Sequence, residues 1–589
     1  MEKKASGLNN WLNFAPFRPP ILECFANYDS SKWSGDWRAG INVALLAIPQ
    51  GMAYALIAGL PPIYGLYAAL SPQIIYALLG TSKQLAVGPV AMDSLLVAAG
   101  LGTISILGPE EYIQSAILLA LLVGIIQFLL GLLKMGFLVS FLSKPLIRGF
   151  TSGAAIIIGL SQIRHILGVP LLQSNKIQLF AISIVKSEMA IHYPTLVIGV
   201  ISIFSLLILK KWNPKVPSAL VVVVLSSLWV YYGKLVQEGV AVVGFVPSGL
   251  PSFNVPHFEF DTIKNLIPIS LTLAIIGYME SISISKTIAE KHKYYQLDPN
   301  QELIALGTSN IFGSLFHSYP TTGGFSRTAV NDQSGAKTGV ASLVCALIVA
   351  ITLSFFTHWF FYLPKAVLGA IIIVAVIQLI DIKYAIRLYN SRKDEFAVLL
   401  LTFILTLFVG ITQGILFGII LSLLLLVYRV SKPHYAFLGR IRNTNYFQNI
   451  ERFPDEVTVR EDLIILKFDA QLFFGNIEFF KKLVFEAVEK NSKKIKGFII
   501  NARSINYIDS TAAEELVLII KKLQRKDIRV MVVGAIDPSR DIIIKSKLID
   551  ILKKQNLFVT SGDATDSFDG VSKKTALQKK LSRQSNPID

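Results

Sequence analysis

The sequence predicts a polytopic α-helical membrane protein of about fourteen spans, followed by a small α/β domain. Three observations carry this prediction. The 589 residues are 53% hydrophobic and only 16% charged, whereas soluble domains carry about 25% charged residues. Long apolar runs recur from about residue 40 to residue 430. Beyond Pro433 the pattern changes to short apolar runs that alternate with helical spacing, which is typical of an α/β fold.

The surplus of positive charge has two interpretations. The chain carries 56 Lys and Arg against 39 Asp and Glu, a formal charge of +17. Such a surplus is typical of nucleic-acid binding, or of basic residues at the cytoplasmic ends of membrane helices. The basic residues follow the borders of the apolar runs, which excludes nucleic acid as a partner. The two cysteines, Cys24 and Cys345, predict neither a disulfide framework nor a Cys-based zinc site, and we expect no metal or other cofactor.

The apolar runs define the predicted transmembrane domain, residues 40–430. The segment before it, residues 1–39, is polar and has no apolar core, so we expect no cleavable signal peptide and interpret it as a cytoplasmic segment. Several spans are shorter than the ~20 residues that cross the hydrocarbon of a bilayer. In order, the spans cover about residues 40–58, 62–80, 85–101, 113–133, 143–167, 194–210, 217–233, 264–285, 301–317, 325–341, 342–362, 364–380, 395–411 and 413–430.

The basic residues also predict the orientation. An even number of spans places both termini on one side, and the positive-inside rule makes the loops richer in Lys and Arg cytoplasmic. We therefore expect an integral protein of the plasma or inner membrane with both termini in the cytoplasm. The cytoplasmic set is Lys83, Lys144, Arg148, Lys210, Lys211, Lys215, Lys286, Lys291, Lys293, Lys337, Lys383, Arg387, Arg392 and Lys393, and the opposite loops hold mainly Arg164, Lys176, Lys186, Lys234, Lys264 and Lys365.

The α/β domain is predicted over residues 433–568 and is cytoplasmic by this topology. Its strands would form one sheet, and its helices would pack on that sheet. The last residues, 569–589, are polar and basic, and we expect them to be disordered. Strands are predicted at 463–468, 497–501 and 528–533, and helices at about 476–491 and 510–525.

Two short spans, the third and the tenth, occupy matching places in two halves of seven. Gly88-Pro89 interrupts the start of the first, and Gly323-Gly324 precedes the second. Paired interrupted segments of this kind indicate an inverted repeat whose half-helices meet near the midplane. Each helix start exposes unpaired N–H groups and about +0.5 of dipole charge, so two facing starts attract an anion. The alternative is that Gly-Pro only marks a loop, and without the matching position that alternative would be preferred.

Charged residues inside the predicted spans strengthen the anion hypothesis. Arg327 lies at the start of the tenth span, where a buried cation needs an anionic partner. That partner is either a substrate or a carboxylate, of which Glu280 in the eighth span is the obvious one. A structural Arg327–Glu280 ion pair therefore remains an alternative. Asp93 is a second intramembrane acid, and we interpret it as a hydrogen-bonded helix residue.

The first span contains polar groups suited to an anion. Gln50 and Tyr54, four residues apart, share one helix face, and Pro49 with Gly51 would bend the helix locally. An amide and a phenol donate hydrogen bonds without adding charge. The alternative is a hydrogen bond between helices.

These residues resemble the signature of the SulP anion transporters, the family of the sulfate permeases and of the animal relatives that include prestin. The resemblance rests on AIPQGMAYA at 47–55, AGLPPIYGLY at 58–67, GTS at 80–82, Gly88-Pro89 and NDQSGAKT at 331–338. YIDSTA at 507–512 resembles the strand-to-helix turn of a STAS domain. The resemblance spans about residues 20–560 and its motifs are specific in combination.

The resemblance implies a 7+7 inverted repeat of the UraA-like type, divided into core and gate parts, that works as a homodimer by an elevator-like motion. It implies a substrate site between the third and tenth helix starts. Gln50, Tyr54, Ser326 and Arg327 match substrate-side positions of the family. The helix starts add Val90, Ala91 and Phe325, and Val90 stands where some relatives have Phe, so an aromatic wall is absent there.

The resemblance also bears on coupling. Sodium-coupled bicarbonate members have an Asp and a Thr on the eighth helix, where this chain has Glu280 and Ile284. Proton-coupled sulfate members have Glu at the matching place. Two helix ends contribute about +1 and Arg327 adds +1, against −2 for sulfate. Sulfate alone would thus neutralise the site, and an ionised Glu280 would leave the occupied site negative, which is costly in a membrane. We therefore predict proton–sulfate symport, with Glu280 protonated when sulfate binds. We expect no enzymatic chemistry.

Several rivals remain open. Bicarbonate, a dicarboxylate, or exchange of chloride would suit the same site. A nucleobase-type permease shares the membrane architecture but usually has an acid in place of Ser326-Arg327 and lacks a STAS domain. A STAS scaffold with a membrane anchor would not need fourteen spans. Ser510 matches a position that is phosphorylated in related STAS proteins, which would allow a cytoplasmic regulatory partner, but Asp509-Ser510 is more simply a helix N-cap.

Overall fold

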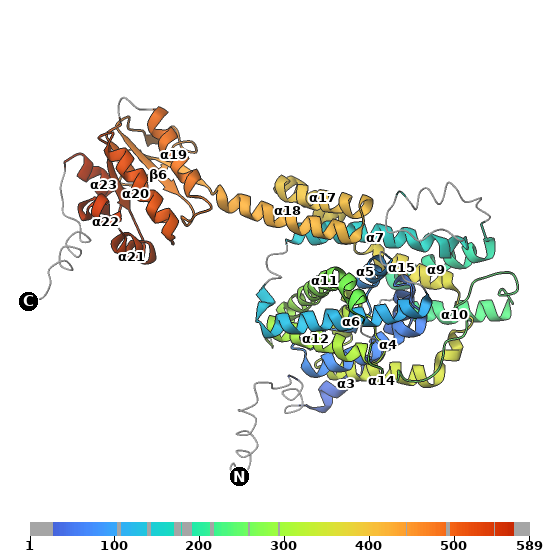
Figure 1. The fold of residues 1–589 in the computed structure, drawn as a ribbon. Helices are drawn as coiled ribbons and strands as arrows, with labels where there is room; N and C mark the ends of the chain where they lie inside the picture. The colour runs from blue at the N-terminus through green and yellow to red at the C-terminus, as the bar shows by residue number, and fades with distance from the viewer. Residues whose placement is uncertain are drawn as a thin grey trace, which may run out of the picture. The chain divides into compact units, whose positions relative to one another are not determined.

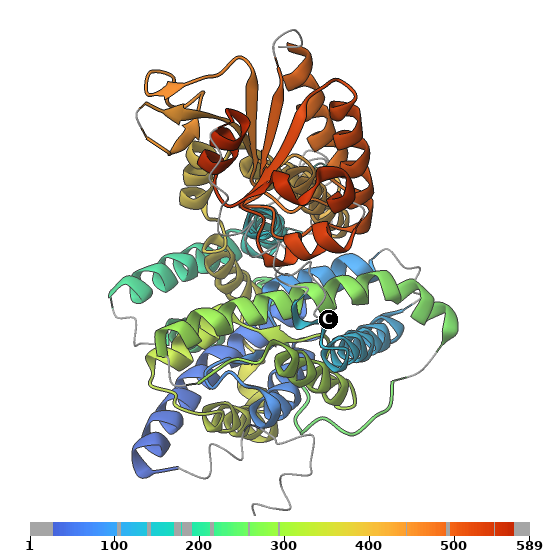
Figure 2. The same ribbon diagram turned by 90° about the vertical axis from the view of Figure 1, so that its left-hand side faces the viewer.

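The chain divides into two compact units in the computed structural model, with the division between Ser422 and Leu423 (Figures 1 and 2). The predicted limits at residues 430 and 433 stay predictions. Of the predicted terminal segments, residues 571–589 and nearly all of 1–27 lie outside the described residues. The structure describes residues 28–102, 108–137, 143–169, 191–212, 217–256, 259–292, 295–442, 444–490, 495–546 and 548–570, with the single positions 20 and 178.

Each predicted span contains one helix of the first unit. Within the described residues, nine helices are long and apolar enough to cross a membrane. The polytopic helical fold is thus confirmed. The helices are α3 (Ser30–Ile57), α4 (Pro62–Leu79), α5 (Ala91–Leu101), α6 (Pro109–Leu132), α7 (Lys144–Leu167), α9 (Tyr193–Trp212), α10 (Ser218–Tyr232), α11 (Phe260–His292), α12 (Pro299–Ser314), α13 (Phe325–Gln333), α14 (Val340–Ile351), α15 (Lys365–Ile377), α17 (Lys393–Phe408) and α18 (Ile411–Ser431).

The membrane helices pack in two groups. Helices α3, α4, α6, α11, α12, α13 and α14 pack mainly on one another, and so do α7, α9, α10, α15 and α17. Helix α3 also contacts α10 and α15, where the two groups meet. This division corresponds to the core and gate parts that the resemblance implies.

Small residues set the closest helix crossing, that of α3 and α4. A Cβ atom placed on Gly65 would lie 1.9 Å from the carbonyl oxygen of Gly51, so the two backbones touch. Membrane helices approach this closely only through small residues. The glycine of the PQGMAYA segment therefore holds the helix that carries Gln50 and Tyr54 against its neighbour.

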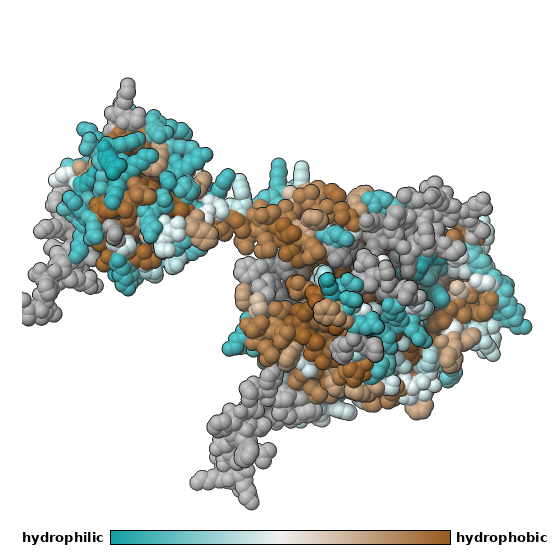
Figure 3. Space-filling model, viewed as in Figure 1, coloured by the Kyte–Doolittle hydropathy of each residue, from teal (hydrophilic) through white to brown (hydrophobic). Residues whose placement is uncertain are grey.

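Helices α17 and α18 show a continuous apolar surface, brown in Figure 3. Its exposed side chains within the first unit include Leu401, Ile404, Phe417 and Ile420. An apolar surface of this extent is typical of a face that contacts lipid or another protein, which fits a membrane-embedded unit.

The second unit is an α/β domain, as predicted. Its sheet has the order β4-β3-β6-β7-β8-β9, with β5 paired to β3. Strands β6 to β9 are parallel, whereas β3 is antiparallel to β6. The elements are β3 (Tyr435–Ile441), β4 (Phe447–Asn449), β5 (Val457–Thr458), β6 (Leu463–Phe468), α19 (Ile477–Lys490), β7 (Gly497–Asn501), α20 (Ser510–Gln524), β8 (Arg529–Val533), α21 (Asp537–Lys545), α22 (Leu548–Leu552), β9 (Leu557–Phe558) and α23 (Ser561–Phe568).

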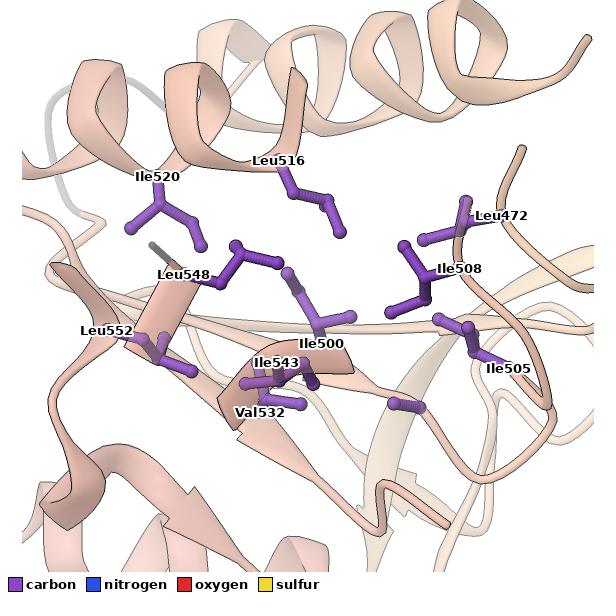
Figure 4. Close-up of a pocket in the computed structure, with 11 residues that line it drawn as sticks. Leu472, Ile500, Ile505, Ile508, Leu516, Ile520, Val532, Ile543, Leu548 and Leu552 are labelled. Atoms are coloured by element: carbon purple, nitrogen blue, oxygen red, sulfur yellow. The ribbon is translucent and has the colours of Figure 1, made fainter. Parts of the chain in front are cut away.

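A small pocket lies in the core of this domain, between the sheet and helices α20 to α22 (Figure 4). Its volume is about 20 Å³, and its lining is entirely apolar, including Ile500, Leu516, Val532 and Leu552. A water molecule in such a space would find no polar partner. The pocket is a packing defect of the core and not a ligand site.

Candidate functional site

The two short membrane helices start from a shared pair of strands. Strand β1 (Val87–Gly88) pairs with β2 (Thr322–Gly323) in antiparallel register, with Val87 opposite Gly323 and Gly88 opposite Thr322. Helix α5 starts three residues after β1, and α13 starts two residues after β2. Because paired antiparallel strands run in opposite directions, the helices leave their crossing in opposite directions. The structure therefore confirms two half-helices whose N-termini lie at one crossing.

Both helix starts lack a side-chain cap. Val90 and Gly324 occupy the N-cap positions of α5 and α13, and neither start receives a side-chain hydrogen bond among the described residues. Uncapped starts leave backbone N–H groups available and carry about +0.5 of charge each. The crossing therefore offers donors and positive potential to an anion.

Arg327 adds a full positive charge to the crossing. Its guanidinium lies against two glycines: a Cβ atom would be 3.3 Å from Nη1 and Nη2 at Gly88, and 2.9 Å from Nη2 at Gly324. Arg327 is only 2% exposed, and within the described part of the chain Nε, Nη1 and Nη2 have no hydrogen-bond partner. A buried cation without a partner is costly. The arrangement therefore calls for an anionic ligand, and the alternative of a direct Arg327–Glu280 ion pair is not formed.

Two acidic side chains lie near this cation. Glu280 of α11 is half-buried, and it is close enough to Arg327 for the two charges to attract each other. Asp93, in the first turn of α5, is 2% exposed and interacts electrostatically with Glu280. Oε2 of Glu280 and Oδ1 of Asp93 have no hydrogen-bond partner among the described residues. Asp93 was expected as a hydrogen-bonded helix residue, and the unpaired Oδ1 places it with the open polar groups of the site.

Helix α3 supplies neutral polar groups beside the crossing. It packs against both α5 and α13, and Gln50 and Tyr54 on it are each 5% exposed. Oε1 of Gln50 has no partner in the described part of the chain, and Tyr54 lies within electrostatic range of Arg327 and Glu280. The α3 helix continues through Pro49. Gln50 and Tyr54 thus lie on a helix that packs against both half-helices, and their role in binding a substrate stays a prediction.

The remaining predicted residues belong to the helix starts themselves. Val90 and Ala91 are 7% and 8% exposed, whereas Phe325 is 63% exposed and Ser326 is also exposed. The first turn of α13 therefore presents Phe325 and Ser326 outward, while the next residue, Arg327, turns back onto the strand pair.

Sequence reasoning missed the polar residues that hold the strand pair in place. Asn310 of α12 accepts a hydrogen bond from the Thr321 amide at 2.8 Å and donates to the Thr321 carbonyl at 3.0 Å. Ser281 of α11 accepts from the Gly323 amide at 2.8 Å. The polar run Thr308-Ser309-Asn310 within the ninth predicted span was the available signal, because polar side chains inside a membrane form hydrogen bonds to neighbouring segments.

A buried carboxylate supports the other strand in the same way. Glu302 of α12, fully buried, accepts hydrogen bonds from the Thr81 amide at 2.8 Å, the Thr81 hydroxyl at 2.6 Å, the Ser82 amide at 3.1 Å and the Tyr76 hydroxyl at 2.8 Å. Four donors compensate the burial of this charge. Glu302 therefore fixes the loop that leads into β1.

No group of three or more potential metal ligands among His, Cys, Asp and Glu occurs in the residues that the structure describes.

In the second unit, Asp509 caps α20 by accepting from the Ala512 amide at 2.7 Å, which confirms the N-cap interpretation. Ser510 next to it is exposed. Its phosphorylation stays a prediction.

The comparisons with known proteins agree with this geometry. Residues 34–402 match the sulfate permease family, and residues 456–564 match the STAS domain. The chain is 37% identical over 569 residues to sulfate transporter 4.1, chloroplastic, of Arabidopsis thaliana, covering 92% of this chain and 82% of the relative. It is 32% identical to a probable sulfate transporter of Mycobacterium tuberculosis, covering 94% and 98% of the two chains. The structure of murine Solute Carrier 26 family member A9 has the same fold, with a TM-score of 0.87 at 24% identity and coverage of 97% and 96%.

An inverted-repeat helical unit with a cationic crossing defines a membrane transporter and not an enzyme. The chain belongs to the sulfate permease family, and it is an anion transporter with a C-terminal STAS domain.

Proposed function

We propose that the protein is a proton-coupled sulfate symporter. The observation that carries the proposal is Arg327, a buried guanidinium without a hydrogen-bond partner among the residues that the structure describes, at the crossing of two uncapped helix starts. The site presents about +2 of charge to a ligand, from Arg327 and two helix ends of about +0.5 each. Sulfate, with a charge of −2, neutralises it. The names of the relatives as sulfate transporters support the same choice of anion.

In the proposed complex, the ligand oxygens accept hydrogen bonds from Arg327, from the amides of the helix starts and from Gln50 and Tyr54. Ser326 adds a hydroxyl at the exposed side of the α13 start. Val90 and Ala91 form the apolar wall of the α5 start. Phe325 lies at the outer edge of the site.

Glu280 is the proposed proton carrier. With sulfate bound, the cation and the two helix ends are already neutralised, so an ionised carboxylate at Glu280 would leave a net negative charge in a medium where net charge is costly. The nearby Asp93 increases that cost because like charges repel. A proton therefore enters with the anion, and in the empty carrier an ionised Glu280 is attracted by Arg327.

The first experiment is uptake of labelled sulfate into proteoliposomes, with proton and sodium gradients imposed separately. We expect uptake to follow an inward proton gradient and to ignore sodium. Unlabelled sulfate should compete better than bicarbonate, oxalate or chloride. Uptake that follows sodium and ignores pH would overturn the proposal, and stronger competition by bicarbonate, a dicarboxylate or chloride would assign the site to that anion.

The second experiment isolates the proton. Glu280→Gln keeps the size of the side chain but holds no titratable proton, so we expect exchange of sulfate for sulfate to persist while uptake driven by the pH gradient falls about tenfold or more. Glu290→Gln is the matched control, since Glu290 is exposed on the same helix. If Glu280→Gln leaves proton coupling intact, Glu280 is not the carrier.

The remaining predictions complete the proposal. The helix group with α3, α5, α11 and α13 would carry the site across the bilayer against the group with α7, α9, α15 and α17, in an elevator-type motion within a homodimer. Both termini would be cytoplasmic, in the plasma or inner membrane. Phosphorylation of Ser510 or binding of a partner to the STAS domain would regulate transport. Crosslinking in native membranes, and the phosphate content of Ser510 under varied sulfate supply, test the dimer and the modification.

A further inference from the structure

A short helix outside the predicted spans, α16 (Ile382–Ser391), connects α15 to α17. Only Arg392 separates it from α17, against which it packs. Asp381 caps it, accepting from the Tyr384 amide at 2.9 Å, and also lies 3.6 Å from Arg148 of α7. Because α16 joins the ends of two apolar helices, it lies where the apolar layer meets water.

The surface of α16 has an exposed apolar ridge, whose last member, Tyr389, also contacts the ring of Phe396 in α17 edge-on, with 5.1 Å between the ring centroids. Ile382, Ile386 and Tyr389 are 64%, 57% and 52% exposed, and their spacing of four and three residues places them on one face. Leu388 is buried and Tyr384 half-buried, and at 100° per residue both lie about 150° around the helix from the ridge, on the side that packs on the protein. An exposed ridge of large apolar side chains on a surface helix fits the headgroup–acyl boundary of a bilayer.

The third face of α16 is basic. Lys383 and Arg387, four residues apart, are exposed and lie about 100° around the helix from Ile382 and Ile386. Arg392 and Lys393 follow and are also exposed. In the described part of the chain, none of these four side chains has a hydrogen bond or ion pair.

The acidic residues near α16 lie elsewhere. Asp381 is occupied by the helix cap and by Arg148, and Asp394 and Glu395 belong to the first turn of α17, where the helix end attracts them. Residues 382–391 themselves contain two basic residues and no acidic residue. The charge of the outward surface of α16 is therefore positive.

We propose that α16 is a binding site for acidic phospholipids. The ridge of Ile382, Ile386 and Tyr389 inserts among the first acyl carbons, while Lys383 and Arg387 contact the phosphates of the headgroups. A negatively charged lipid complements this surface, and the ridge continues the lipid-facing surface of the unit. Since α16 connects α15 and α17, the bound lipid holds the helix group of α7, α15 and α17 at the bilayer surface.

The charge part of the proposal is tested on the full chain in nanodiscs. Each basic residue near an anionic surface contributes roughly fivefold in affinity, so Lys383→Gln with Arg387→Gln should weaken binding of phosphatidylglycerol about tenfold or more, measured by native mass spectrometry. The control Lys521→Gln with Lys526→Gln removes the same charge from exposed positions of the STAS domain and should change nothing. Equal melting temperatures in pure phosphatidylcholine show that both variants fold. Equal lipid binding by the α16 variant and the wild type would overturn the proposal.

The insertion part is tested by nitroxide labels in a Cys24→Ser background. A label at Ile386→Cys should collide with oxygen dissolved in the acyl region, and one at Lys383→Cys with an aqueous nickel complex. Exclusion of both reagents from Ile386→Cys would assign the ridge to a second protein chain instead of lipid. Binding of soluble glycerophosphoglycerol as tightly as of the whole lipid would make the site a free-phosphate site, and either result refutes the proposal.

Discussion

The helix starts at the crossing of the membrane unit differ from two helix starts of the STAS domain. In the STAS domain, Asp509 closes the start of α20 by accepting from the Ala512 amide at 2.7 Å. Thr560 and Asp563 form a reciprocal capping box at α23. In the membrane unit, α5 and α13 start at Val90 and Gly324 without a side-chain cap in the described structure. These two starts of the STAS domain are completed by side chains of the chain itself. Among the described helices, α4, α15 and α21 also start without a side-chain cap, so the buried charge of Arg327 beside the two starts distinguishes the crossing.

Buried and exposed arginines repeat the contrast. Arg460 of the STAS domain bonds to Asp462 at 2.7 Å and to Asp569 at 2.7 Å. Arg327 is more deeply buried, yet it has no partner among the described residues. An unpaired charge at the more costly position indicates function and not stability.

The largest effect is expected from removing the unpaired charge. Arg327→Gln should reduce sulfate uptake in proteoliposomes about 100-fold or more, because a buried charge contact to the ligand is lost. Arg327→Lys keeps the charge without the planar fork and should retain part of the activity. The Arg327→Gln variant should reconstitute into vesicles as well as the wild type and should have a melting temperature no lower than that of the wild type. Near-normal uptake by Arg327→Gln would show that the charge is structural after all.

A cap placed at the crossing should make the start of α13 resemble the capped start of α20. Gly324→Asp introduces a carboxylate at the N-cap of α13, where a Cβ atom is 2.9 Å from Nη2 of Arg327. This tethered anion should displace sulfate at any ordinary concentration, and we expect uptake to fall about tenfold or more. Gly324→Ala controls for the added volume and should reduce uptake less. The measurement is the sulfate concentration that gives half-maximal uptake, and equal effects of the two substitutions would contradict the argument.

Removing the cap in the STAS domain should have a local and smaller effect. Asp509→Ala should destabilise the start of α20 by about 1 kcal/mol, and the Phe474 amide, which donates to Asp509 at 2.9 Å, loses its acceptor. Hydrogen exchange of the first turn of α20 in the full chain should therefore accelerate about fivefold. Asp541→Ala, at an exposed site of α21, should not change that exchange.

The smallest effect is expected at Arg460. Its hydrogen bond holds the pKa of Asp462 below the ordinary value, so the contact contributes stability above the unfolded-state pKa of about 3.9 and loses it as the pH falls below that value. The side chains are 35% and 38% exposed, which limits the contribution to about 1 kcal/mol or less. Exchange of β6 should therefore be faster in Arg460→Gln than in the wild type at pH 7, and this difference should decrease as the pH falls below about 3.9 and Asp462 takes up a proton. A difference that does not decrease with falling pH would exclude the ion pair as its cause.

The membrane fold could be predicted from the sequence because the patterns that indicate it are local. Apolar runs mark the spans, and Gly88-Pro89 and Gly323-Gly324 mark the two half-helices. The contacts of Arg327 with Gly88, and of Asn310 with Thr321, could not be predicted, since they depend on which segments the packing brings together. Helix α16 was assigned to a loop because ten residues with a mixed pattern are too short for a span.

The STAS domain shows the same limit. The central strands β6, β7 and β8 are continuous apolar runs because both faces are buried, and they were predicted. Strands β3, β4, β5 and β9 lie toward the edges of the sheet and have short or mixed patterns, so local reasoning did not find them. In the membrane unit, the role of Glu302 could not be predicted, because a charged residue inside an apolar run does not indicate which four donors surround it in the folded protein.

The pairing of β1 with β2 also has a consequence for selectivity. Two residue pairs in fixed register set the separation of the helix starts, and a slip of one residue would change it by about 3.3 Å, more than the difference in radius between common inorganic anions. The backbone of the site therefore keeps the two helix starts at a constant separation. A change of preference to a larger or smaller anion would then require substitutions of the side chains around the helix starts. We expect insertions or deletions in either strand to abolish transport.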